Sequence, residues 1–213
     1  HEALSLIAGK GLACAAFELA DSPSSASKIA QQQGFPVALK ISSPDIVHKS
    51  DAGGVELNLE TPEAVEKAYD QLLTRIQKTF PQAQIDGVLV NKMAPPGQEV
   101  IVGMNRDPQF GPIILFGLGG VLVEIFRDVA LRHLPLSRED ALRMIQEIEG
   151  YQVLTGYRGQ PPVDLAPLAD CLLGVAKIAE EYPKIVEIDL NPVFAYPQGA
   201  LVADARIIME EDN

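Results

Sequence analysis

The sequence predicts an α+β fold built from two lobes. Helical and strand patterns are mixed along the chain, without the repeating strand–helix–strand order of a doubly wound parallel sheet. Two prolines and a glycine interrupt the chain at residues 94–97, and short, largely antiparallel strand patterns dominate after them. We therefore expect a single domain with approximate lobes at residues 1–94 and 95–213.

The helices of the first lobe have local sequence signals. Residues 2–12 show a modest helical pattern of apolar residues. A serine–proline pair at residues 22–23 is a capping signal for a second helix, which Gly34 ends. Thr61 and Pro62 begin a third, strongly amphipathic helix. Strands are expected at residues 13–17, in the run that ends at Lys40, and at residues 54–59 and 85–93.

The second lobe is expected to be a sheet of short strands with two helices. Ser137 as N-cap and Asp140 at N3 mark the start of one helix, which ends at Gly150. An Ala- and Leu-rich pattern at residues 164–181 predicts the other, and residues 151–162 are expected to form a loop. Strands are expected at residues 99–104, 113–116, 121–126, 130–134, 186–194 and 200–208.

Composition narrows the class of protein. With 47% hydrophobic and 22% charged residues, the 213-residue chain lies in the range of globular proteins. Its formal charge of −12 argues against a nucleic-acid partner or an anionic membrane surface. The longest apolar run, residues 112–123, is too short for a membrane span and contains three glycines. Cys14 and Cys171 are expected to be buried thiols, so the sequence favours a cytoplasmic protein.

One stretch near the N-terminus combines groups that suit phosphate chemistry. Lys40 ends an apolar strand, His48 follows in a polar loop, and Gly53-Gly54 closes that loop. A lysine supplies a point charge, a histidine is a nucleophile near neutral pH, and glycine lets backbone N–H groups approach an oxyanion. Asp51 could orient the histidine ring. The alternative is a solvated lysine and an ordinary loop histidine.

A glycine-rich turn at residues 117–120 joins two apolar strand patterns. It is neither a Walker nor a dinucleotide motif, because no Lys-Ser/Thr and no third spaced glycine follow. Glu124 lies just beyond this turn and could contact a metal or, with Arg127 nearby, a phosphate. The alternative is a charged strand end on the surface.

A group of oxygen-bearing side chains lies near the C-terminus. Strand alternation places Glu187, Asp189 and Asn191 on one face, and Asp204 follows on a neighbouring strand. Mg²⁺ usually takes one or two protein oxygens together with substrate phosphates, so Asn191 and Asp204 would suffice. A strand whose polar face meets water is the alternative.

Five motifs, in this order, resemble one family. They are Phe-Pro-Val-Ala-Leu-Lys (residues 35–40), Ser-Pro-Asp-Ile-Val-His-Lys-Ser-Asp-Ala-Gly-Gly-Val (43–55), Asn-Arg-Asp-Pro-Gln-Phe-Gly-Pro (105–112), Phe-Gly-Leu-Gly-Gly-Val-Leu-Val-Glu (116–124) and Glu-Ile-Asp-Leu-Asn-Pro-Val (187–193). Together they are similar to the ATP-grasp β subunit or domain of ADP-forming acyl-CoA (acetyl-CoA) synthetases, related to the succinyl-CoA synthetase β chain. The resemblance implies a two-lobed ATP-grasp fold with nucleotide bound between the lobes.

The resemblance also implies roles for single residues. His48 matches a phosphohistidine that relays a phosphoryl group to ADP, and Lys40 matches the strand lysine that contacts nucleotide phosphates. Asn191 and Asp204 match magnesium ligands, with Asp189 and Glu124 as possible additional residues of the site. The other nucleotide-binding positions implied are the hinge residues Asn91, Lys92 and Met93, the ribose-binding Glu99, and Gly119 with Gly120. At the hinge the family pattern Gln-Glu-Met is replaced by Asn-Lys-Met, so the resemblance implies that the hinge backbone, and not these side chains, contacts adenine.

The full reaction implied interconverts acyl-CoA, ADP and phosphate with the free acid, CoA and ATP. It would require a CoA-binding and ligase α subunit, or a fused domain, so we expect a hetero-oligomer or a fused polypeptide. Mg²⁺ and ATP or ADP are the expected cofactor and substrate. A different function stays open: similar segments in fused protein acetyltransferases resemble non-catalytic effector-binding domains.

Overall fold

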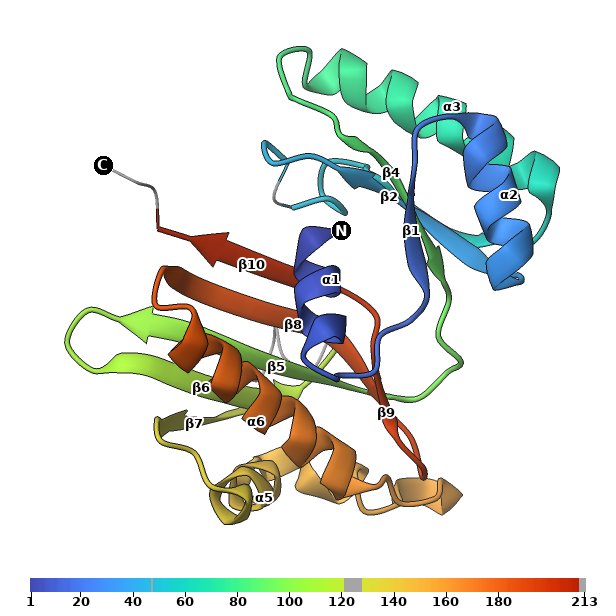
Figure 1. Ribbon diagram of the computed structural model, residues 1–213. Coiled ribbons are helices and arrows are strands. Elements are labelled where there is room, and N and C mark those ends of the chain that lie inside the picture. Colours follow the sequence, from blue (N-terminus) through green and yellow to red (C-terminus); the bar gives the residue numbers. More distant parts are fainter. Residues whose placement is uncertain (47, 121–127, 211–213) are drawn as a thin grey trace. The chain divides into compact units, whose positions relative to one another are not determined.

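The computed structural model describes residues 1–46, 48–120 and 128–210 (Figure 1). These residues form two compact units. The first contains His1 and Ala15–Ala94, and the second contains Glu2–Cys14 and Pro95–Asn213. We describe each unit by itself.

The first unit is a four-stranded antiparallel sheet, with strand order β1-β4-β2-β3 and two helices. Both helices begin where the sequence predicts, because Ser22 and Thr61 accept hydrogen bonds from backbone N–H groups three residues ahead, at 3.2 Å in each case. The elements are β1 (Phe17–Ala20), α2 (Pro23–Gln33), β2 (Val37–Ser42), β3 (Val55–Leu59), α3 (Pro62–Thr79) and β4 (Gly87–Lys92).

Strand alternation divides this sheet into two faces. Val37, Leu39 and Ile41 of β2 belong to the same buried cluster as side chains of α2 and α3. The intervening residues of β2, which include Lys40, therefore lie on the face away from these helices. Because Ala38 is directly opposite Asn91, the side chain of Asn91 shares that helix-free face.

The second unit is a six-stranded antiparallel sheet with strand order β10-β8-β5-β6-β7 and β9 paired to β8. Ser137 and Asp140 form a complete capping box at the start of α5, as predicted. The elements are α1 (Glu2–Gly9), β5 (Gln98–Asp107), β6 (Gly111–Leu118), β7 (Val129–His133), α5 (Arg138–Glu147), η1 (Glu149–Val153), η2 (Tyr157–Gly159), α6 (Leu165–Glu181), β8 (Ile185–Ala195), β9 (Ala200–Val202) and β10 (Ala205–Met209).

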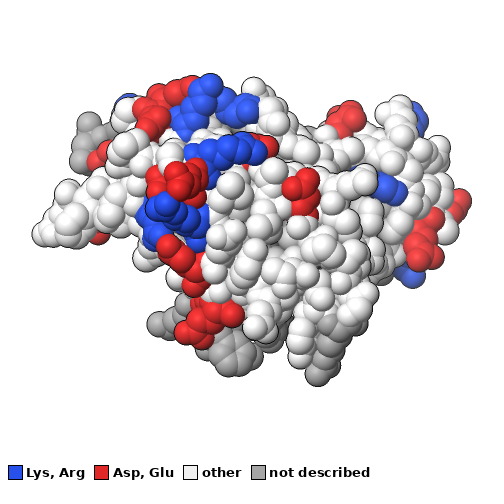
Figure 2. Space-filling view, turned by 90° about the horizontal axis from the view of Figure 1, so that it is seen from below, with Lys and Arg blue, Asp and Glu red and all other residues white. Residues whose placement is uncertain are grey.

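Helices α5 and α6 cover one face of this sheet. Val102 and Met104 of β5, Phe116 of β6 and Leu190 of β8 are buried on this side, together with Ile145 of α5. On this side of the second unit, basic and acidic side chains lie side by side (Figure 2), and several from α5, α6 and β7 are paired. The pairs are Arg132–Glu147, Arg138–Asp170 and Arg143–Glu139.

The sequence-based assignment was wrong at residues 13–17. The strand of this region is β1, which begins at Phe17 and pairs with β4. The preceding segment instead contacts β9, because the Val202 N–H donates to the carbonyl oxygen of Ala13 at 2.8 Å and Cys14 forms a bridge with Val202. These long-range contacts place Glu2–Cys14 in the second unit.

Three further segments differ from expectation or lie outside the described residues. Short 3-10 helices occupy part of the predicted loop at residues 151–162. The strand predicted at residues 200–208 is interrupted at residues 203–204, which separates β9 from β10. The strand predicted at residues 121–126 lies outside the described residues. Among the helices that the structure describes, none is long and apolar enough to cross a membrane.

Candidate functional site

In the first unit, the predicted residues come from one sheet face and one loop. Lys40 lies on β2 opposite Leu89 of β4, and Asn91 is two residues further along β4. Diagonal neighbours of this kind in an antiparallel pair are roughly 7–8 Å apart at their Cα atoms. The structure therefore brings Lys40 and Asn91 onto the same face of the sheet, the one away from α2 and α3.

His48 is exposed in the loop between β2 and β3, whose beginning is anchored to the first unit. Asp45 accepts a hydrogen bond from the Gln84 backbone N–H at 2.6 Å. Ile46 is buried in the core with 3% exposure. The chain is therefore held in place up to two residues before the histidine.

The end of the loop is anchored as well. Arg75 of α3 donates from Nε to the carbonyl oxygen of Gly53 at 2.7 Å and pairs through Nη2 with Glu56, also at 2.7 Å. Gly54 packs closely, because a Cβ there would lie 2.5 Å from Cγ2 of Ile41. An exposed imidazole between two fixed loop ends is accessible to a reaction partner.

The double glycine does not present its N–H groups to a ligand, contrary to our expectation. The Gly53 N–H donates to the carbonyl oxygen of Ser50 at 3.0 Å, and the Gly54 N–H donates to that of Lys49 at 2.7 Å. Its role in this structure is to close the loop. In the described part of the chain, no hydrogen bond joins Asp51 to the His48 ring.

The predicted hinge residues differ in what their groups contact. The Lys92 ammonium donates to the carbonyl oxygen of Phe35 at 2.6 Å, so this side chain links β4 to the connection between α2 and β2. The backbone N–H groups of Lys92 and Met93 donate to the carbonyl oxygens of Ala16 and Pro36 at 2.8 and 3.1 Å. These N–H groups are therefore committed within the protein.

Asn91 is the residue of the hinge with unused hydrogen-bonding capacity. It is 3% exposed, and both its Oδ1 and Nδ2 atoms are buried without a hydrogen-bond partner among the described residues. Such a group costs about 1–3 kcal/mol unless something pairs with it. The Asn91 side chain is thus a candidate ligand contact.

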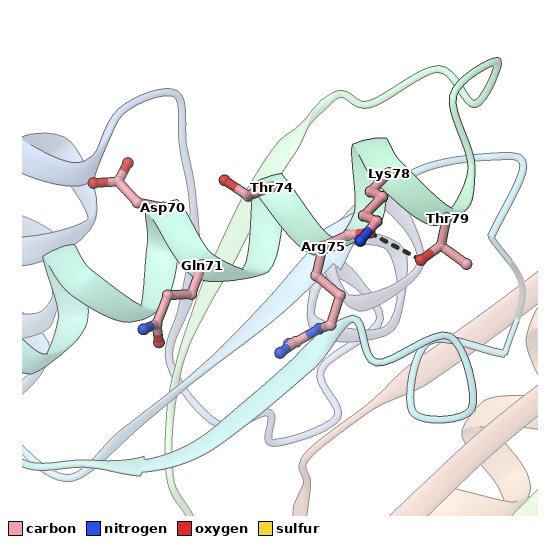
Figure 3. Close-up of a pocket in the computed structure, with 6 residues that line it drawn as sticks. All are labelled: Asp70, Gln71, Thr74, Arg75, Lys78 and Thr79. Atoms are coloured by element: carbon pink, nitrogen blue, oxygen red, sulfur yellow. Dashed lines mark hydrogen bonds between the residues drawn. The ribbon is translucent and has the colours of Figure 1, made fainter.

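A depression of about 690 Å³ lies along α3 and contains no predicted site residue (Figure 3). Its lining comes from this one helix, where the Thr79 hydroxyl donates to the Arg75 carbonyl oxygen at 3.0 Å. The lining residues are Asp70, Gln71, Thr74, Arg75, Lys78 and Thr79. Its mixture of charges is that of a solvated helix surface, so we do not place the chemistry here.

In the second unit, Glu99 lies against the glycine turn at the end of β6. The Gly119 N–H donates to the carbonyl oxygen of Glu99 at 2.8 Å. A Cβ on Gly119 would come within 3.0 Å of the Glu99 backbone, and one on Gly120 within 3.2 Å of its Oε2 atom. The glycines therefore allow close approach of the Glu99 carboxylate. Glu124, predicted nearby, lies outside the described residues.

Asn191 lies at an irregularity in β8. Between Val100 and Val102 of β5, the partner residue on β8 changes from Val193 to Leu190, so β8 carries one extra residue there. The Asn191 N–H donates to the carbonyl oxygen of Asp204 at 3.3 Å. The two predicted metal ligands are thus neighbours on adjoining segments. Amide and carboxylate oxygens are hard donors that suit Mg²⁺.

Next to this pair, Arg206 holds two further carboxylates. Its Nη2 atom pairs with Oε1 of Glu187 and lies 3.7 Å from Oδ2 of Asp189. Burial raises the pKa of the Asp189 carboxyl, the positive charge of Arg206 opposes this, and the negative charges of Glu187 and Asp204 add to it. Within the described ranges, no group of three or more His, Cys, Asp or Glu side chains is arranged to hold a metal ion.

Sequence reasoning missed Arg75 and Arg206. The signal for Arg206 is present, because strand alternation from Asp204 places it on the same face two residues later. Arg75 had no local signal, since its partner Gly53 is 22 residues away in the sequence.

Comparison with known proteins identifies close relatives. A family model described as ATP-grasp domain matches residues 1–209. The chain is 45% identical to the β subunit of acetate–CoA ligase (ADP-forming) I of Pyrococcus furiosus, over 98% of the chain and 90% of that subunit. It is 44% identical to acetate–CoA ligase (ADP-forming) I of Archaeoglobus fulgidus, over 99% of the chain but only 31% of that longer protein.

Solved structures of a dinucleotide-forming acetyl-coenzyme A synthetase 1 from Ca. Korarchaeum cryptofilum are also similar. One, in complex with coenzyme A, Ca-AMPCP and HgCl⁺, is 50% identical with a TM-score of 0.95, over 99% of this chain and 92% of that chain. Another, with coenzyme A and Mg-AMPPCP, has its phosphohistidine segment pointing towards the nucleotide binding site; it is 47% identical with a TM-score of 0.85, over 99% and 91%. The predicted resemblance and the α+β ATP-grasp fold are confirmed.

Proposed function

Because the chain belongs to the ATP-grasp family and, within it, to the β subunits and domains of ADP-forming acetate–CoA ligases, we propose that it transfers a phosphoryl group between His48 and ADP or ATP with Mg²⁺. The observation that carries the proposal is the exposed His48 between two anchored ends of its loop. The phosphohistidine segment and Mg-AMPPCP of the Korarchaeum synthetase support it.

The chemical step is a phosphoryl transfer. In the direction of ATP synthesis, the bond between phosphorus and the His48 ring nitrogen breaks, and the nitrogen keeps the electron pair. A terminal β-phosphate oxygen of ADP forms the new bond to phosphorus. Positioning and charge neutralisation dominate catalysis of such transfers, and the Lys40 ammonium supplies positive charge to the phosphates.

The metal-binding role falls to Asn191 and Asp204, whose oxygens fit a hard cation that also takes phosphate ligands. When bound, Mg²⁺ neutralises charge on the phosphates. The backbone link from Asn191 to Asp204 keeps the two residues adjacent. Glu99, beside Gly119 and Gly120, is assigned to the ribose of the nucleotide.

The base of the nucleotide is assigned to the hinge. Because the N–H groups of Lys92 and Met93 are committed to Ala16 and Pro36, the groups proposed to meet adenine are the Asn91 amide and the hinge carbonyl oxygens. An amide offers one donor and one acceptor, which matches the N6–H and N7 pair of adenine. This assignment revises the expectation that the hinge backbone alone makes the contact.

The chain spans about a third of the single-chain Archaeoglobus ligase and most of the Pyrococcus β subunit. We therefore propose that it works with a CoA-binding α subunit or fused domain, and that the assembly interconverts acyl-CoA, ADP and phosphate with acid, CoA and ATP. A cytoplasmic location remains a prediction.

Labelling with [γ-³²P]ATP and Mg²⁺ tests the proposal. Wild type should acquire a label that is labile to acid and stable to base, and His48→Ala should acquire none. His133→Ala is the matched control, since His133 is an exposed histidine on β7 and should leave labelling intact. Calorimetry with ADP should show binding to all three proteins. Full labelling of His48→Ala would refute the role of His48, and ADP binding without any labelling would favour the effector-binding alternative.

A further inference from the structure

Arg206 has a specific arrangement with carboxylates beside the proposed metal ligands. It lies on β10 directly opposite Asp189 of β8, and residues directly opposite each other share a face of the sheet. Its guanidinium contacts Glu187, which is its diagonal neighbour, and lies 3.7 Å from Asp189. One cation therefore engages two carboxylates on the strand that also carries Asn191.

The side chains of this strand offer a divalent cation several possible oxygen ligands. Glu187, Asp189 and Asn191 alternate along one face of β8, and the Asn191 N–H contacts the Asp204 backbone on the adjoining segment. A divalent cation would gain more charge by taking Glu187 or Asp189 as a ligand than by taking the neutral amide of Asn191. Another group must therefore keep the cation at Asn191 and away from these two carboxylates.

We propose that Arg206 is a positioning residue that keeps the carboxylates of Glu187 and Asp189 out of the coordination shell of the divalent cation. The cation then stays at Asn191 and Asp204 and depends on nucleotide phosphates for its remaining ligands. The proposal rests on the proposed function. A guanidinium suits this role because its planar fork can hold more than one carboxylate, and it stays charged at any physiological pH.

Exposure of these groups is consistent with this role. The side chains of Arg206, Glu187 and Asp189 are 33%, 30% and 35% exposed, so the cluster is open to an incoming ion. Without Arg206, two carboxylates would face the same surface without their cation. They would attract a divalent ion even in the absence of nucleotide, and would draw it away from Asn191 and Asp204.

Binding of Mn²⁺, measured by electron paramagnetic resonance on the full chain with and without ADP, tests the proposal. Wild type should bind Mn²⁺ weakly alone and more tightly with ADP. Arg206→Met should bind Mn²⁺ alone on the order of tenfold more tightly, because the count of available charged ligands rises. Its rate of histidine labelling should fall roughly 10–100-fold because the cation is drawn away from Asn191 and Asp204; changes just outside the ligands of a metal site have effects of this size. Arg206→Lys, which keeps the charge but not the fork, should be intermediate.

Three controls make the result decisive. Arg132→Met removes a different arginine–glutamate pair, that with Glu147, and should change neither quantity. Asp189→Asn should leave Mn²⁺ affinity without ADP at the wild-type value, and in the Arg206→Met background it should reverse the tighter binding. Because Asp189→Asn keeps Arg206, it tests the idea even where Arg206→Met fails to fold.

Two outcomes would overturn the proposal. One is unchanged Mn²⁺ affinity in a folded Arg206→Met variant, and the other is weaker Mn²⁺ binding in Asp189→Asn, which would make Asp189 a ligand. Failure of the proposed function is a different result, since wild type itself would then show neither ADP-dependent Mn²⁺ binding nor labelling.

Discussion

Arg75 of α3 donates from Nε to the carbonyl oxygen of Gly53 at 2.7 Å, and so links the C-terminal part of a long helix to the end of the His48 loop. The same guanidinium pairs with Glu56 on β3, the strand that follows the loop. One side chain therefore fixes both the loop end and the strand into which it leads. A residue that never contacts the reacting atoms can in this way set the position of His48.

Arg75→Met should slow labelling of His48 by at least about tenfold, because a small displacement of a reacting group has large effects on rate. Its effect on stability should be small. The ion pair is 40% and 32% exposed at its two side chains, and exposed pairs contribute about 0–1 kcal/mol. Lys78→Met, on an exposed position of the same helix, is the control. An unchanged labelling rate in folded Arg75→Met would show that this anchor does not position the histidine.

Gly54→Ala should destabilise the first unit. A Cβ at this position would lie 2.5 Å from Cγ2 of Ile41, which is fully buried, and 3.1 Å from the carbonyl oxygen of Lys49. Overpacking of this kind costs about 1–3 kcal/mol. Gly9→Ala is the matched control, because a Cβ there meets nothing within 4 Å and alanine favours the helix by up to about 1 kcal/mol. Urea unfolding of both variants gives the comparison, and equal stabilities would contradict the packing argument.

Features with local causes could be predicted from the sequence. Ser22, Thr61 and Ser137 begin helices because the cap lies within three residues of the groups that it satisfies. The proximity of Asn191 and Asp204 was also expected, since alternation and a short connection bring neighbouring strands together. In these cases the residues that interact are close in sequence or belong to consecutive strands.

Features with long-range causes could not be predicted. The segment Glu2–Cys14 joins the second unit because Val202, nearly 190 residues later, pairs with Ala13. The N–H groups of Gly53 and Gly54 donate hydrogen bonds within their own loop, and whether they do so depends on the surrounding packing. No sequence signal shows that the amide of Asn91 is buried without a hydrogen-bond partner among the described residues, since the same residue type is common on exposed strands.

The variant Asn91→Leu tests whether the Asn91 amide contacts the nucleotide or has only a structural role. The buried amide has no hydrogen-bond partner in the part of the chain that the structure describes, so replacing it by an apolar side chain of similar size should leave the free energy of unfolding unchanged or raise it by about 1 kcal/mol. Affinity for ADP should fall on the order of tenfold, which corresponds to about 1.4 kcal/mol of lost pairing. Asn105→Leu, at an exposed asparagine of β5, should change neither. Calorimetric titration with ADP and thermal unfolding measure the two effects. A gain in stability with unchanged ADP affinity would mean that the amide does not contact the nucleotide.

The two cysteines give a prediction about pH. Burial raises the pKa of the Cys14 thiol to about 11 and, with smaller effects of Asp170 and Cys14, raises that of Cys171 to about 12, from an ordinary value of 9.0. Both thiols should therefore react slowly with a disulfide reagent at pH 8 in the folded protein and rapidly in urea.

The same shifts make stability depend on pH above the ordinary thiol range. Between pH 9 and about 11 the unfolded chain has lost these protons while the folded chain keeps them, so the unfolded state binds fewer protons and stability falls as pH rises. Below pH 9 both states are protonated and this contribution to the slope vanishes. A Cys14→Ala, Cys171→Ala double variant should show a shallower decline in its urea midpoint between pH 8 and 10 than wild type. Equal slopes would mean that the thiols titrate alike in the folded and unfolded chains, and would contradict the raised pKa values of half-buried Cys14 and buried Cys171.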